Sequence, residues 1–125
     1  MSEKEPKKPK YTFTPVGDNL KGKLIHGVVL GKDTLKDFEI RVARTGDMFD
    51  AEELASPLKM LAYKGALLSC QIVRLGDIEG PIDFDLIRKL HPEDFDMLTD
   101  AMDQVEASGK DSSSHSGAGT NASSS

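Results

Sequence analysis

The stretch HPEDFDMLTDAMDQVE, residues 91–106, decides much of the fold because its apolar and acidic side chains separate cleanly on a helix. The apolar residues recur at steps of three or four, which is the spacing of one helix face. The acidic residues follow the same steps about 200° further round the axis. The apolar face is formed by Phe95, Leu98, Met102 and Val105, and the acidic face by Glu93, Asp96, Asp100 and Asp103. This segment therefore predicts a helix that packs through one face.

Upstream of this helix, the pattern predicts a β-hairpin with one buried face. Residues 24–30 read LIHGVVL, a turn follows at residues 31–33, and residues 35–43 alternate apolar and polar side chains. Residues 11–14 predict a third, short strand before them. Because two strands alone are marginally stable, the apolar face of the hairpin must pack on helices.

Between the hairpin and the acidic helix, the sequence predicts three further helical segments. Thr45 is the expected cap of a first helix that ends near Ala55. Asp83 is the expected cap of a short helix that runs to Leu90. Between them, Ser56-Pro57 starts a central helix that runs to Leu75 and ends at Gly76. Its apolar stripe contains Leu58, Leu61, Ala62, Gly65, Leu68, Ile72 and Leu75. This stripe is expected to cover the hairpin.

These elements predict an α+β fold, with a small N-terminal β-hairpin of two or three strands packed on a mainly helical C-terminal part. One small domain spans residues 11–107. Residues 1–10 are rich in Lys and Pro and are expected to form a disordered basic arm. Residues 108–125 are rich in Ser and Gly and are expected to form a disordered tail, because they supply no core residue.

The charge distribution argues against a nucleic-acid partner. Residues 1–75 carry 13 Lys/Arg and 10 Asp/Glu, whereas residues 76–125 carry 3 Lys/Arg and 11 Asp/Glu, so the second half is strongly acidic. Such a surface repels phosphate, and the Lys residues of the arm are offset by Glu3 and Glu5. No apolar run is long enough for a membrane span or a signal peptide, so a soluble intracellular protein without a membrane partner is expected.

No catalytic, cofactor-binding or metal-binding motif is present in the sequence. There is no nucleophile elbow, no phosphate-binding loop and no dinucleotide fingerprint. His26, His91 and His115 fall in a strand, at a helix start and in the tail, without metal-ligand spacing. The single cysteine, Cys70, is expected to be a buried apolar residue. We therefore expect a protein that binds partners and is not an enzyme.

The apolar stripes have two interpretations, either as core or as an open surface for a partner helix. Both interpretations stay open from the sequence alone. If part of the stripes is open, the partner-binding residues come from the central helix and the acidic helix. This hypothesis names Leu58, Leu61, Leu68, Phe95, Leu98, Met102 and Val105.

The order of these pieces resembles the tail assembly chaperones of Mu-like and related contractile-tailed phages. The likeness covers residues 24–106: a glycine hairpin turn, a strand with a basic residue, a Gly-Asp step, a helix ending in Leu-Gly and a final Leu-x-x-x-Asp segment. The family usually has a proline before the Gly-Asp step, where this chain has Ala43-Arg44-Thr45. The matching residues are Gly31, Arg41, Gly46, Asp47, Leu75, Gly76, Leu90 and Asp94.

The resemblance implies a small factor in the host cell cytoplasm that binds the tape measure protein and keeps it soluble during tail assembly. Such a chaperone is shed when tail tube protein polymerises and is not retained in the virion. The resemblance also implies, as further partners, the tail tube protein and a longer form of the chain made by translational frameshifting. Whether the chain forms a homo-oligomer stays open. The alternative is a structural tail or baseplate component that remains in the particle.

Overall fold

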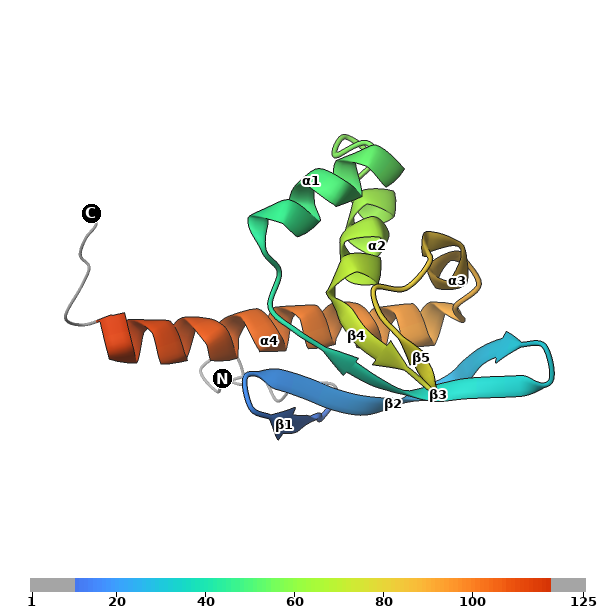
Figure 1. The fold of residues 1–125 in the computed structure, drawn as a ribbon, viewed down its shortest axis with the longest axis horizontal. Helices are drawn as coiled ribbons and strands as arrows, with labels where there is room; N and C mark the ends of the chain where they lie inside the picture. Colours follow the sequence, from blue (N-terminus) through green and yellow to red (C-terminus); the bar gives the residue numbers. More distant parts are fainter. Residues whose placement is uncertain (1–10, 118–125) are drawn as a thin grey trace, which may run out of the picture.

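The computed structural model describes residues 11–117, with side chains through residue 108, and shows a five-stranded antiparallel sheet with four helices (Figure 1). The strands are β1 (Thr14–Val16), β2 (Asn19–Leu30), β3 (Asp33–Ile40), β4 (Ile72–Leu75) and β5 (Ile78–Glu79), and they lie in the sheet in chain order. The helices are α1 (Thr45–Leu54), α2 (Met60–Gln71), α3 (Phe84–Arg88) and α4 (Pro92–Gly117). The predicted basic arm, residues 1–10, and residues 118–125 of the predicted tail lie outside the described residues.

The α+β class is confirmed, but the predicted size of the sheet is wrong. The sheet has five strands where a hairpin or three strands were expected, so the C-terminal part is not mainly helical. The hairpin itself is longer than predicted, because β2 begins at Asn19 and pairs with β3 as far back as Leu20. The short first strand is β1, which begins at Thr14 and not at Tyr11.

The largest error concerns the predicted central helix, which ends at Gln71 and not at Leu75. Residues 72–75 form β4, where Ile72 pairs with Ile40 of β3. Residues 66–75 are almost wholly apolar, so their periodicity does not separate helix from strand. The edge of β3 supplies the hydrogen-bonding partner that favours the strand, and Ile72 is β-branched.

Gly76 ends a strand and not a helix, as the φ angle of 59° and the turn into β5 show. A Cβ at this position would lie 2.6 Å from the Cδ2 atom of Leu35, so the close approach of the turn to β3 also requires glycine.

Other helix boundaries also differ from the prediction, and α3 ends at Arg88 and not at Leu90. The cap of α1 is Arg44 and not Thr45, which is the first residue of the helix. The central helix begins at Met60, because residues 56–59 form a turn in which the Ser56 hydroxyl accepts a hydrogen bond from the Leu58 N–H. At the far end, α4 continues to Gly117, into the stretch that composition assigned to the tail. Two predicted features are confirmed: α4 begins at Pro92, and Asp83 caps α3.

The core lies between the sheet and the helices α2, α3 and α4. Figure 1 shows α4 lying along the sheet, and α4 contacts both β2 and β3. The apolar face of α4 supplies Leu98, Met102 and Val105 to this core, which settles their interpretation as core residues. Cys70 is also buried, and burial raises the pKa of its thiol. Within the described part of the chain, no helix is long and apolar enough to span a membrane.

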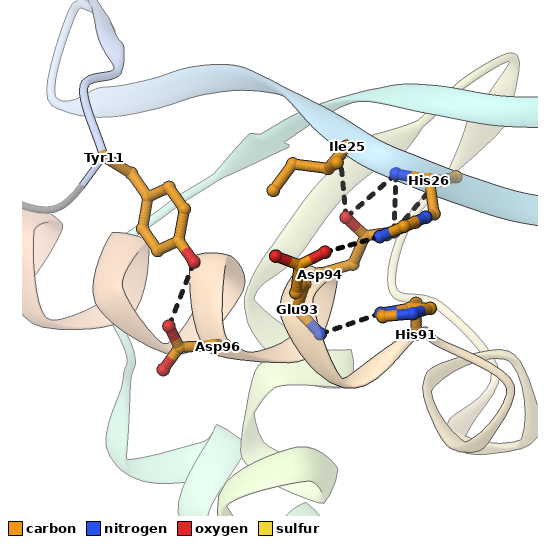
Figure 2. A network of polar contacts seen from close by, with 8 residues as sticks. Tyr11, Ile25, His26, His91, Glu93, Asp94 and Asp96 are labelled. Carbon is orange, nitrogen blue, oxygen red and sulfur yellow. Dashed lines mark hydrogen bonds and ion pairs between the residues drawn. The ribbon is translucent and has the colours of Figure 1, made fainter.

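One buried carboxylate joins the start of α4 to β2. The register of β2 against β3 shifts between Lys23 and Val28, and this bulge leaves backbone N–H groups without strand partners. The side chain of Asp94, which is completely buried, accepts hydrogen bonds from the backbone N–H groups of Ile25 (2.7 Å), His26 (3.2 Å) and Gly27 (2.9 Å) (Figure 2). Asp94 therefore fixes the position of α4 on the sheet.

Gly27 makes this bulge possible. Its φ angle is 85°, and a Cβ there would lie 2.7 Å from the Cγ2 atom of Thr34 on β3. The positive φ angle suits glycine far better than a residue with a side chain.

The substitution Asp94→Asn tests this contact. The side-chain amide of Asn has only one acceptor oxygen, and its NH2 group would face the backbone N–H groups of β2. We therefore expect a loss of about 2–3 kcal/mol in the free energy of unfolding, measured by urea denaturation. Asp103→Asn is the matched control, because Asp103 is exposed on the same helix. Equal stabilities of the two variants would contradict the role of Asp94.

Candidate functional site

Large apolar side chains are exposed on the helical hairpin formed by α1, α2 and the turn between them. Figure 1 shows this hairpin projecting away from the sheet. Leu58 is 93% exposed and Met60 80% exposed, both at the end of the hairpin that is furthest from the core. The exposed apolar residues of the hairpin are Met48, Phe49, Leu54, Leu58, Met60 and Leu61. We call the part formed by Leu58, Met60 and Leu61 the hairpin tip.

An open groove of about 1020 Å³ runs beside the hairpin tip. One side is formed by the end of α1 and the start of α2, and the other by α3 and the start of α4. The apolar groove, as we call it, is lined mainly by carbon atoms. Its larger apolar residues are Leu54, Met60, Leu61, Phe84, Ile87, Leu90, Pro92 and Phe95. A groove between helices with this lining is a common site for small molecules or for an amphipathic helix.

The structure separates the seven predicted partner-binding residues into two groups. Leu58 and Leu61 are exposed at the hairpin tip, and Phe95 is half-buried and lines the apolar groove. The other four, Leu68, Leu98, Met102 and Val105, are buried in the core and are not available to a partner in this structure.

Sequence reasoning missed the residues that complete the groove. Phe84 and Ile87 come from α3, and Leu54 and Met60 flank the turn between α1 and α2. The available signal was the turn itself, because residues 54–60 place several large apolar side chains around Ser56-Pro57, where polar residues are usual.

An ion pair positions α1, which supplies one wall of the groove. The guanidinium of Arg41 donates to both carboxylate oxygens of Asp47, at 2.8 and 2.9 Å, and to the backbone oxygens of Val42 and Cys70. The Asp47 carboxylate also accepts from the N–H of Arg44 at the start of α1. Both carboxylate oxygens of Asp47 thus accept hydrogen bonds within the fold, so this carboxylate serves a structural purpose.

The pKa values of the pair reflect this contact. Burial alone would raise the pKa of Asp47, but the hydrogen bonds from Arg41 and from the Arg44 backbone, together with both positive charges, lower it below its ordinary value. The hydrogen bond to Asp47 raises the pKa of Arg41. Because the pKa of Asp47 is lower in the folded chain than in the unfolded chain, the pair stabilises the fold above about pH 4 and loses this effect as the pH falls further.

We expect Asp47→Asn to lower the free energy of unfolding by roughly 2 kcal/mol at pH 7, because Arg41 loses its charged partner. The difference from the unmodified chain should shrink as the pH falls below about 4, because Asp47 is then protonated first in the unfolded chain and, at lower pH, in the folded chain. Urea denaturation across this pH range measures both effects. Asp50→Asn, at an exposed position of α1, is the control. A difference that stays constant into acid would contradict the assignment.

Two histidines that lie far apart in the sequence are brought together at the start of α4. The rings of His26 and His91 stack with their centroids 3.6 Å apart and their planes 17° from parallel. Nε2 of His26 lies 2.7 Å from Oε1 of Glu93, and Nδ1 of His91 accepts from the Glu93 N–H (Figure 2). His91 therefore caps α4 with its ring nitrogen.

His26, His91 and Glu93 also place potential metal-ligand atoms within 4.8 Å of one another. An ion bound by imidazole lies in the plane of the ring, at about 2 Å from the nitrogen. Two nearly parallel rings stacked above one another do not share such a point. In this arrangement, His26, His91 and Glu93 form a hydrogen-bonded cap and not a set of metal ligands.

Five of the eight residues that carry the family resemblance are structural in this chain, whereas Leu90 lines the apolar groove. Arg41 and Asp47 hold α1, Asp94 holds α4, and Gly31 and Gly76 lie in turns with positive φ angles. None of these five lines the apolar groove. The sequence pattern thus identifies mainly a scaffold, and the candidate site is the surface that this scaffold presents.

Comparisons with known proteins agree with the resemblance. A family model described as "Tail assembly protein gp41" matches residues 24–118, which is most of the chain. No curated protein and no solved structure gives a significant match. The matched range contains every residue that lines the groove and both buried carboxylates. The expected family is confirmed: this chain belongs to the gp41 family of Mu-like phage tail assembly proteins.

Proposed function

We propose that this chain is a tail assembly chaperone that binds the tape measure protein through the apolar groove and the hairpin tip. The observation that carries the proposal is the exposure of Leu58, Met60 and Leu61 beside an open apolar groove. Exposed apolar patches on small proteins mark interaction sites, because leaving such side chains in water costs free energy. In a tail assembly protein, the partner is a component of the tail.

The shape and chemistry of the groove favour a helical segment as the bound partner. A groove between helices accepts the apolar stripe of another helix, and its lining is aliphatic and aromatic. Met60 has a flexible thioether side chain that adapts to stripes of different composition. A tape measure protein is expected to be a long helical protein with such stripes. Binding several copies of this chain would cover the stripes and prevent aggregation.

The openness of the groove suits a chaperone that is later released. The tip residues lie on one hairpin and the groove is open to solvent, so we expect the contact area of each copy to be small. Small interfaces are weak and dissociate quickly. Polymerising tail tube protein could then displace the copies one after another, so that the chaperone is absent from the finished virion.

Co-expression with the tape measure protein from the same genome tests the proposal. We expect a soluble complex with the unmodified chain and an insoluble tape measure protein with the double variant Met60→Asp/Leu61→Asp. Both positions are exposed in the first turn of α2, which has no acidic residue, so Asp there is compatible with the helix dipole and with folding. The readout is the fraction of tape measure protein in the supernatant and in a pull-down.

The matched control is Val29→Asp, an exposed apolar position of the β2–β3 hairpin. This variant should solubilise the tape measure protein as well as the unmodified chain does. Full activity of Met60→Asp/Leu61→Asp, or loss of activity in Val29→Asp alone, would contradict the proposed site. Mass spectrometry of purified virions tests release, because a structural tail component would be found in the particle and a chaperone would not.

A further inference from the structure

We infer that the segment held in the apolar groove is an amphipathic helix whose apolar stripe is flanked by acidic residues, which Lys59 and Arg88 recognise. This inference rests on the proposed function, because it specifies the partner of the same groove. It concerns the charge of the bound helix, which neither the family match nor the apolar lining determines.

The charged residues of the groove have one sign. The only charged side chains among its lining residues are Lys59 and Arg88, and both residues are exposed. Lys59 immediately precedes α2 and Arg88 ends α3, so the two cations come from different elements. Neither belongs to an ion pair in the described part of the chain.

The positive sign of the groove contrasts with the net charge of the chain. The formal net charge of the chain is −5, and Arg88 is one of 3 basic residues in residues 76–125, which carry 11 acidic residues. Because both charged residues that line this apolar groove are basic, charge complementarity favours a partner that brings negative charge to them.

Segments of this chain fit the groove poorly. Residues 1–10, MSEKEPKKPK, have a net positive charge and no apolar stripe, and residues 118–125, AGTNASSS, have no large apolar residue. The hairpin tip of a second copy would bring its own Lys59 toward Lys59 and Arg88. Like charges at this distance oppose association, so a partner with acidic flanks is favoured over a second copy.

The geometry of an amphipathic helix matches these requirements. Residues three and four apart form its apolar stripe, and the positions on either side of the stripe face the rim of the groove. Glu or Asp at these positions would meet Lys59 and Arg88. At physiological salt, charges are largely screened beyond about 8 Å, so the charges that line the groove have the greatest influence on a bound helix.

Two designed helical peptides test the inference. They share one stripe of Leu residues and differ only at the flanking positions, which are Glu in one peptide and Lys in the other; a third peptide has Ser in place of Leu. Affinities are measured by fluorescence anisotropy at about 0.15 M salt. We expect the Glu peptide to bind the unmodified chain about tenfold more tightly than the Lys peptide, and the Ser peptide not to bind.

The double variant Lys59→Glu/Arg88→Glu should reverse this preference. Lys32→Glu/Arg74→Glu is the matched control, because it changes the net charge equally at exposed positions outside the groove. Circular dichroism confirms that each variant is folded. The inference is overturned if the two peptides bind equally, if the Lys peptide binds more tightly, if neither binds, or if the groove variant keeps the original preference.

Failure of this inference is distinguishable from failure of the proposed function. If the tape measure protein is solubilised through Met60 and Leu61 but the peptides show no charge preference, the function stands and the inference fails. If the tape measure protein is not bound at all, the proposed function fails, whatever the peptides show.

Discussion

The structure depends on one buried carboxylate, Asp94, which accepts hydrogen bonds from three consecutive backbone N–H groups of β2. Without this partner, the bulge between Lys23 and Val28 would bury unsatisfied donors, at a free-energy cost of about 1–3 kcal/mol for each. The contact also fixes the first turn of α4 against β2, so the apolar face of that helix packs on the sheet in one defined position. Sheet, core and one wall of the groove therefore depend on the same side chain.

A second polar contact completes the scaffold. Arg41 and Asp47 hold the start of α1 against the end of β3, so α1 needs little apolar burial of its own. Ala51 is the only buried apolar residue of α1, whose larger apolar side chains, Met48, Phe49 and Leu54, are exposed. The fold thus separates two tasks: buried polar contacts and the α4 core provide stability, and the hairpin exposes the apolar surface that we propose binds a partner.

The sequence predicted the elements with strong periodicity and missed those set by distant contacts. The hairpin, the α4 stripe and the Asp83 cap follow from local patterns, which is why they are confirmed. Residues 72–75 are apolar throughout, and only the edge of β3 makes them a strand. The groove could be predicted only in part, because Phe84 and Ile87 reach it through the tertiary position of α3. A resemblance pointed to Asp94, but the three N–H groups that it binds lie in a segment about 70 positions earlier, which no local rule connects.

The central claim is that a tail component docks at the groove formed by α1, α2, α3 and the start of α4. Hydrogen exchange of the soluble complex with the tape measure protein, read by mass spectrometry, tests it most directly. The account predicts slower exchange in residues 54–62 and 84–95, and unchanged exchange in the β2–β3 turn at residues 29–34. Protection confined to that turn, or no protection in the groove, would contradict the account.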